Sequence, residues 1–314
     1  MHISIKTIWK VIKESGQDFI NFRITRMSAA LAYYTIFSIA PLLILVISVT
    51  TIFYGKSAIE GSVYGEIRSF VGDAAALQIQ ELIKNATVAK GNAFASGASI
   101  IALIIGATGI FGEIQDSINF IWGLKAKPKR GILKMLINRL LSFSIIVSVS
   151  FILLVSLMVN TVLDVLSARL IKVFPGITVY LAYSGNLLIT FLVTTLLFGV
   201  IFKILPDAKI KWRDVLTGSI TTSLLFMLGK FAITFYLGTK NIGNTYGAAG
   251  SIIIVLLWVY YSAIILYFGA AFTKNYAQAK GRRIYPNDYA VWIEYVEKEK
   301  AGSLQQQTST IVHT

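Results

Sequence analysis

A stretch of 29 residues without a charged side chain, from Met27 to Gly55, most constrains what this chain can fold into. A helix needs about 20 predominantly apolar residues to cross the hydrocarbon core of a bilayer, so this stretch can cross it with a tilt. The stretch also carries polar groups, which are expensive in lipid unless they face other helices or a wet cavity. The candidates for lining such a pathway are Tyr33, Tyr34, Ser38 and Pro41.

The composition is that of a polytopic membrane protein. Hydrophobic residues make up 55% of the 314 residues and charged residues only 14%, whereas a soluble domain carries about 25% charged residues. The chain has no Cys, and its two His residues, His2 and His313, lie at opposite ends. Disulfides and thiolate metal sites are therefore excluded. We expect no metal site and no cofactor.

Five further long apolar runs follow the first one. Together the runs predict six transmembrane helices, near 29–54, 94–112, 138–161, 180–203, 215–237 and 248–272. The predicted fold class is therefore all-α, a bundle of six membrane-spanning helices. We divide the chain into an N-terminal segment (1–26), a membrane domain (27–277) and a basic tail (278–314). In the tail we expect a short helix over 286–300 and disorder from about 301.

Two segments outside the spans have the pattern of amphipathic helices. Residues 3–23 place apolar side chains at helical spacing, with Lys6, Lys10 and Lys13 on the opposite side. Two interpretations have equal weight: a helix lying on the inner leaflet, or an ordinary cytoplasmic helix packed on the bundle. The first outer connection, 55–93, predicts one or two amphipathic helices that cover the outer surface.

The basic residues separate into two groups. Of the 29 Lys and Arg residues, 21 lie in the N-terminal segment, the second and fourth connections and the tail. Seven lie in the remaining connections, and Lys230 lies within a span. The positive-inside rule therefore places both termini in the cytoplasm. The net charge of +14 then indicates anionic lipid at the cytoplasmic face as a partner, and no nucleic acid. Whether the protein forms a homo-oligomer is left open by the sequence.

The second predicted span carries glycines and carboxylates. Glu113 and Asp116 form an i, i+3 pair at its inner end, near Asn119. The carboxylates could bind a cation or relay protons, but we favour ion pairs with basic neighbours such as Arg139. Glycines on one helix face let another helix approach closely, which we prefer to a pathway role. The predicted packing glycines of this span and the last one are Gly106, Gly109, Gly112, Gly247 and Gly250.

Lys230 is the basic residue well inside a span. An ionisable group at membrane depth is by default a functional candidate, suited here to an anion or a lipid phosphate. The alternative is that its long stem reaches the outer headgroups. The last span adds Tyr246, Trp258 and Tyr261 as candidate substrate contacts. Aromatic residues at mid-span more often serve helix packing.

Four stretches of the chain resemble one known family. They are SAALAYYTIFSIAPL (28–42), GIFGEIQDSINFIW (109–122), WRDVL followed by Gly218 (212–218), and YGAAG with LWVY (246–260). On these residues the chain resembles the YihY/BrkB family of bacterial inner-membrane proteins. The resemblance implies six helices, both termini in the cytoplasm and no settled activity. The family's last span commonly ends in Gly-Ala-Glu, whereas this chain reads Gly269-Ala270-Ala271, so no role of that carboxylate can be carried over.

Three functions remain as hypotheses. The first is passive or ion-coupled transport of a lipid or an amphipathic solute. The second is a non-catalytic membrane scaffold in envelope assembly. The third is a membrane-bound ribonuclease, because proteins of the family have carried the label ribonuclease BN. The third is weakest, since the sequence has no nucleotide-binding loop, no internal His and only scattered carboxylates. We therefore expect a protein that is not an enzyme.

Overall fold

The structure is a computed structural model that describes residues 5–36, 77, 109–126, 175–239, 249–288 and 290–293. The predicted span at 138–161, most of those at 29–54 and 94–112, and the tail beyond 293 lie outside the described residues. So does the outer connection 55–93, apart from Leu77. Five candidate site residues also lie outside them: Ser38, Pro41, Gly106, Tyr246 and Gly247.

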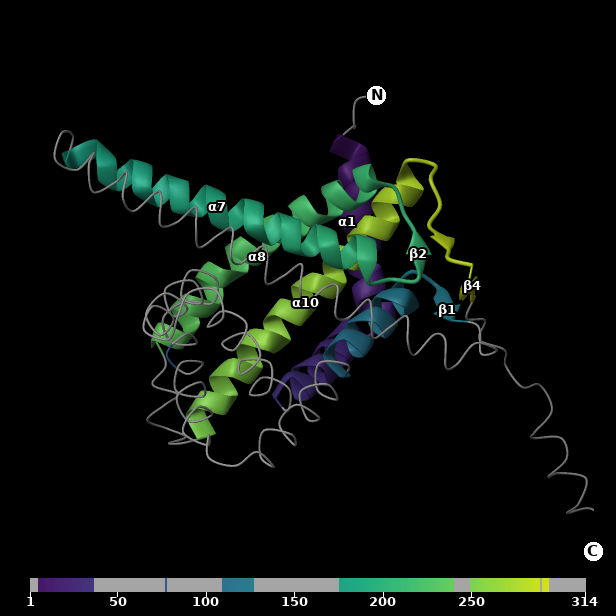
Figure 1. Cartoon of the computed structure of the whole chain (residues 1–314), viewed down its shortest axis with the longest axis horizontal. Helices are drawn as coiled ribbons and strands as arrows, with labels where there is room; N and C mark the ends of the chain where they lie inside the picture. The colour runs from purple at the N-terminus through teal and green to yellow at the C-terminus, as the bar shows by residue number, and fades with distance from the viewer. Residues whose placement is uncertain are drawn as a thin grey trace, which may run out of the picture.

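Three long helices form the centre of the described structure (Figure 1). They are α7 (Pro175–Ile204), α8 (Trp212–Thr239) and α10 (Ala249–Ala279). Each holds a segment that is long and apolar enough to cross a membrane: Ser184–Ile204, Trp212–Ile233 and Ile253–Ala279. These helices coincide with the last three predicted spans.

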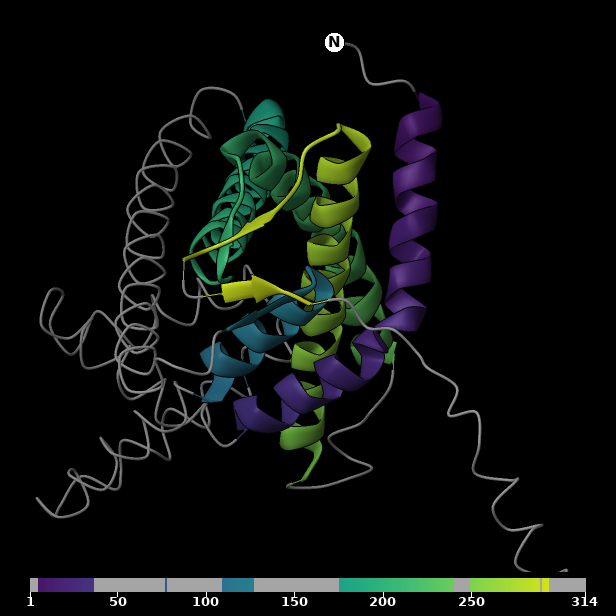
Figure 2. The ribbon, with the colours of Figure 1, turned by 90° about the vertical axis from the view of Figure 1, so that its right-hand side faces the viewer.

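The long helices pack in sequence order. α8 contacts both α7 and α10, and α10 also contacts α1 (Ile5–Asn21). Figure 2 shows α1 running alongside α10. α1 ends in a turn at Arg23, which has a left-handed backbone (φ 52°), and the chain then forms a second helix over 24–36. Of the two interpretations of this N-terminal segment, packing on other helices is the one that the contacts show.

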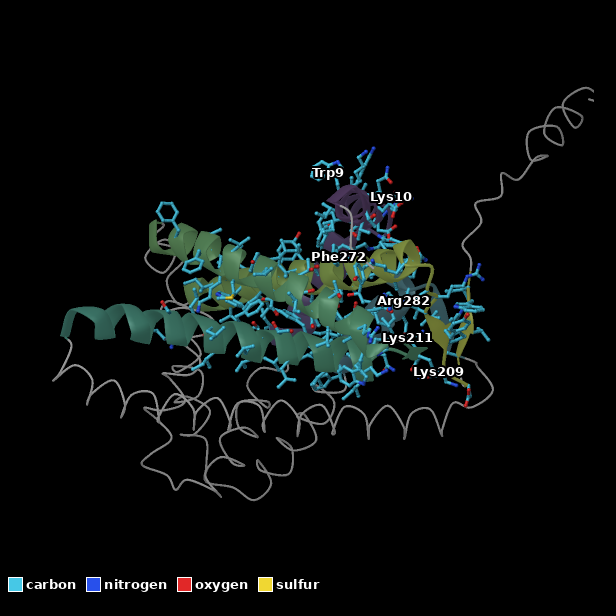
Figure 3. All side chains as sticks on the ribbon, turned by 90° about the horizontal axis from the view of Figure 1, so that it is seen from above. Trp9, Lys10, Lys209, Lys211, Phe272 and Arg282 are labelled. Atoms are coloured by element: carbon cyan, nitrogen blue, oxygen red, sulfur yellow. The ribbon has the colours of Figure 1, made fainter. Side chains whose placement is uncertain are left out.

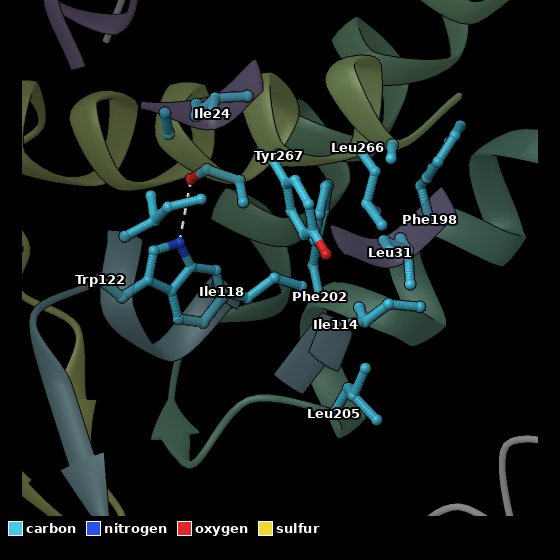
Figure 4. Packing of buried hydrophobic residues seen from close by; sticks show 14 of the residues in the cluster. Ile24, Leu31, Ile114, Ile118, Trp122, Phe198, Phe202, Leu205, Leu266 and Tyr267 are labelled. Carbon is cyan, nitrogen blue, oxygen red and sulfur yellow. Dashed lines mark hydrogen bonds between the residues drawn. The ribbon is translucent and has the colours of Figure 1, made fainter. Parts of the chain in front are cut away.

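The main core lies where the helix at 24–36, a helix at 109–121 and the three long helices meet. Figure 4 shows Ile24, Ile118, Phe202 and Tyr267 in this core, and all four are fully buried. Leu205, which follows α7, is buried with them. Burying large apolar side chains of this kind contributes about 1.5–3 kcal/mol each in water. The core therefore joins segments that lie far apart in the sequence.

The described structure is mostly helical, as the all-α class predicts, but it also contains four short strands that were not predicted. β1 (Leu124–Ala126) pairs with β4 (Ala290–Trp292), and β2 (Ala208–Lys209) pairs with β3 (Tyr285–Pro286), both antiparallel. β4 also replaces the first part of the short helix predicted over 286–300, because its backbone bonds with β1 outweigh a weak local preference. We call the end of the molecule where these strands lie, where α7 and α10 end and α8 begins, the strand end.

Candidate functional site

The candidate site is a polar face between α7 and α8. Ser219, Ser223 and Lys230 are spaced by four and seven residues, so they share one face of α8. Both serines are fully buried and Lys230 is half-buried. A Cβ placed on Gly199 of α7 would lie 3.7 Å from the Ser219 Oγ atom, so this face of α8 is turned toward α7.

Two hydroxyl groups in this interface lack hydrogen bonds. α7 and α8 are joined by the short segment 205–211 and run in opposite directions. Thr195 and Ser223 therefore lie at one level, each a turn further from the strand end than the Gly199–Ser219 contact. Both hydroxyl oxygens are buried with no hydrogen-bond partner within the described part of the chain. Leaving such a group unsatisfied costs about 1–3 kcal/mol.

An aromatic row lies beside this interface. The rings of Phe198 (α7) and Phe226 (α8) are 5.8 Å apart, and Phe226 and Trp258 (α10) are 5.5 Å apart. Trp258 and Tyr261 follow at 6.3 Å. The Tyr261 hydroxyl is 3.2 Å from the carbonyl oxygen of Leu225. Tyr261 thus holds α10 to α8, in agreement with the packing role considered for it. Trp258 Nε1 is buried with no hydrogen-bond partner among the described residues.

Asn119 lies at the strand end, in a contact that the sequence did not reveal. Its side-chain amide donates to Asp207 Oδ2 at 3.0 Å, and the Asp207 N–H donates to Asn119 Oδ1 at 2.8 Å. Gln115 Nε2 donates to Asp207 Oδ1 at 2.8 Å. Asp207 is fully buried, so these bonds compensate for the loss of its hydration. One signal was available: Asp207 is the sole acidic residue between Asp164 and Asp214.

Glu113 is half-buried and accepts a hydrogen bond from the Ser117 hydroxyl at 3.3 Å. Burial raises the pKa of Glu113, Asp116 raises it further, and the bond from Ser117 lowers it. The buried Tyr267 hydroxyl lies near both groups without a hydrogen bond of good geometry. Arg139, the basic neighbour considered for Glu113, lies outside the described residues.

Two further ion pairs at the strand end were also missed. Arg282 Nη2 lies 2.8 Å from Oδ1 of the buried Asp214, which joins the start of α8 to the segment after α10. Lys274 Nζ lies 3.2 Å from Asp18 Oδ2, and Asn275 Nδ2 donates to the same oxygen at 3.0 Å. These pairs fasten α8 and α1 to α10.

The remaining candidates do not meet in one cavity. Tyr33 and Tyr34 are exposed on the helix at 24–36, and a Cβ on Gly109 would lie 3.7 Å from Tyr34 Cδ1. A Cβ on Gly112 would have no described neighbour within 4 Å. Gly250 lies in the first turn of α10. Three glycines at the α8–α10 contact were missed, namely Gly218, Gly229 and Gly269.

A metal site finds no support in the described part of the chain, where no three His, Cys, Asp or Glu residues are grouped to hold an ion. The functional groups along the α7–α8 face and the aromatic row are hydroxyls, one lysine and aromatic rings. Such groups bind and orient polar molecules by hydrogen bonds and charge.

Several known proteins similar to this chain are named UPF0761 membrane proteins. A UPF0761 membrane protein of Mannheimia succiniciproducens is 28% identical over 260 residues, covering 80% of this chain and 84% of that protein. A UPF0761 membrane protein of Saccharophagus degradans is 25% identical. The match covers 83% of this chain and 58% of that protein. A Bacillus subtilis protein whose name calls it ribonuclease-like, YfkH, is 27% identical. The match covers 77% of this chain and 86% of that protein. No solved structure matches the chain.

A family model described as virulence factor BrkB matches residues 16–289. The match covers the described helices α7, α8 and α10 and the end of α1 from residue 16 onward. It also agrees with the motif resemblance noted in the sequence. The chain is therefore a membrane protein that belongs to the BrkB family.

Proposed function

We propose that this protein moves a lipid or an amphipathic solute across the bacterial inner membrane, along the α7–α8 face. The observation that carries the proposal is the pair of buried, unsatisfied hydroxyls of Thr195 and Ser223. Polar groups without partners are costly at membrane depth. A passing headgroup or its water would supply the missing hydrogen bonds.

The charge of Lys230 on the same face supports the proposed transport path. Lys230 lies two turns beyond Ser223, or about 10 Å along α8. An ammonium group inside a span is costly unless it has a role or reaches the interface. On this face it would attract the phosphate or carboxylate of a headgroup.

Exposed apolar side chains beside the polar groups suit an amphipathic cargo. They lie along both helices: Leu188, Leu192, Leu196, Leu224, Leu228 and Phe231. Acyl chains would remain in contact with such a surface while the headgroup follows the hydroxyls. A purely polar solute would gain nothing from it.

The test is flux in proteoliposomes, measured as lipid scrambling and as solute efflux. Thr195→Val keeps the side-chain shape and removes the hydroxyl, and Lys230→Met removes the charge. Each should reduce flux about threefold to tenfold, the equivalent of one or two weak polar contacts. Thr217→Val is the matched control, because the Thr217 hydroxyl already donates to the Arg213 carbonyl on the exposed side of α8. Equal flux in all three variants would contradict the proposed path.

A scaffold in envelope assembly is the second candidate. It is favoured by polar groups that bind other helices, such as Asn119 on Asp207 and the Trp122 indole on the Ala270 carbonyl at 2.9 Å. A scaffold predicts no flux above empty liposomes across lipids and common solutes. In that case, crosslinking to partner proteins in the envelope becomes the informative measurement.

Membrane lipids are the partners that we propose for α1. Among its described residues, α1 exposes Ile8, Trp9 and Ile12, and Lys6 and Lys10 are also exposed. This combination suits the interface of an anionic leaflet. Figure 3 shows Trp9 and Lys10 projecting from the helix assembly.

A further inference from the structure

A hollow of about 1020 Å³ opens at the strand end, away from the α7–α8 face. It lies between the turn after the helix at 109–121, strand β4 and the end of α10. Among the described residues, its lining includes three basic side chains and no acidic one. The residues that matter here are Trp122, Lys274, Gln278, Arg282, Arg283 and Trp292. Figure 3 labels Arg282 and Lys211 at this end.

The positive charge of the hollow is only partly compensated. Lys274 is paired with Asp18, and Arg282 is paired through Nη2 with Asp214. The Arg282 Nε–H is buried and has no hydrogen-bond partner within the described part of the chain. Arg283 is exposed and forms no ion pair with any described residue. One full charge and one buried donor are therefore left for an anion.

The two arginines are held in place by the end of α10. Gly281 has a left-handed backbone (φ 67°), and the Arg282 N–H donates to the Ala277 carbonyl at 2.9 Å. This is the Schellman pattern that ends a helix with glycine. The ion pair with Asp214 then fixes the Arg282 side chain. A site whose donors are positioned in advance loses less free energy on binding.

The opposite wall is held by a second glycine turn. Gly123 has a φ of 70°, and its carbonyl accepts the Ile293 N–H at 2.9 Å, which keeps β4 beside the turn. The indole N–H groups of both tryptophans are occupied, by the Ala270 carbonyl for Trp122 and by the Ile284 carbonyl for Trp292. Trp122 is buried and supports the wall, whereas the Trp292 ring is 52% exposed and offers apolar surface to a ligand.

We infer that this hollow binds a phosphate group carried on a larger organic body. Guanidinium groups match the geometry of phosphate oxygens. The exposed indole of Trp292 suits the carbon part of the ligand. The phosphate belongs either to the headgroup of a lipid in the adjacent leaflet or to a soluble compound. This inference does not rest on transport, since it concerns a different part of the molecule.

The test is calorimetric titration of the full chain in nanodiscs of a neutral lipid. Glycerol 3-phosphate represents the soluble source, and short-chain dihexanoyl phosphatidic acid represents the lipid headgroup. Similar affinities for both would support the site with a soluble phosphate compound as ligand. Binding of the short-chain lipid alone would support the lipid source. Failure of both to bind would overturn the inference.

Arg283→Gln provides the residue-level test. Losing one charge-assisted contact should weaken binding about tenfold. Arg213→Gln is the matched control, because Arg213 is also exposed near the strand end but does not line the hollow. It should change affinity by less than about twofold. Equal weakening in both variants would mean general charge attraction and would overturn the site. Both side chains are exposed, so an unchanged unfolding temperature confirms that the variants are folded.

Discussion

Gly218 of α8 and Thr273 of α10 are in direct contact, so close that a Cβ on Gly218 would overlap the threonine hydroxyl. The reverse relationship occurs between Gly269 of α10 and Thr222 of α8. Each threonine donates to the carbonyl of the glycine four residues earlier in its own helix, at 2.7 Å. Small residues let two helices approach closely, and the internal bonds satisfy the buried hydroxyls.

Gly218→Ala should therefore destabilise the protein. The added methyl forces α8 and α10 apart, and overpacking of this kind costs about 1–3 kcal/mol. The measurement is the thermal unfolding midpoint in detergent. Gly112→Ala is the control, since its Cβ meets no described neighbour and the change favours a helix by about 1 kcal/mol. A Gly218→Ala protein as stable as the control would contradict the tight contact.

In the Asp207→Asn variant, the strand end should unfold at a lower temperature, or at a lower denaturant concentration, than in the wild type. The bonds from Gln115 and Asn119 are arranged for a carboxylate, and an amide offers one acceptor fewer. Disrupting a buried charged network costs about 3–5 kcal/mol. Asp288→Asn is the control, because that carboxylate is 88% exposed and its pair with Lys209 contributes little. Similar losses in both variants would argue against the buried network.

The raised pKa of Glu113 should make the stability of the protein depend on pH. The pKa of Glu113 in the folded protein is raised above the usual value of about 4.3. The folded state therefore holds this proton more tightly, so the contribution is full at low pH and is lost as pH rises through the folded pKa.

Glu113→Gln should remove this part of the pH dependence. The unfolding temperature of the variant, relative to that of the wild type, should increase as the pH rises above about 4.3, the pKa of a glutamate in an unfolded chain. The measurement is a series of thermal scans across pH 4–8, about the range in which the group titrates. Glu14→Gln, at a partly exposed carboxylate on α1, serves as the comparison. Parallel pH curves for wild type and Glu113→Gln would show that burial of Glu113 has no such effect.

Tyr261→Phe separates packing from transport. The variant loses the contact with the Leu225 carbonyl, which should lower stability by about 0.5–1.5 kcal/mol. Flux in proteoliposomes should stay at the wild-type level, because this hydroxyl binds helix backbone. Tyr260→Phe makes the same chemical change one residue away. A loss of flux confined to Tyr261→Phe would instead place this hydroxyl on the pathway.

Some of the site was within reach of sequence reasoning. Lys230 stood out because a lysine inside an apolar run is rare, and the structure places it on the face of Ser219 and Ser223. The serines themselves gave no signal, since a hydroxyl in a helix normally bonds to its own backbone. That Ser223 does not do so depends on the packing of α7 against α8.

The sequence by itself determined the helices α7, α8 and α10, because apolar length and the absence of charge are local properties of a segment. It also determined the family, through short motifs. Only the tertiary structure decided which polar groups meet. Asn119 and Asp207 are 88 residues apart in the chain, and β1 and β4 are further apart still. A hydrogen bond needs a partner at a set distance and angle, and such partners come together only when distant segments have packed.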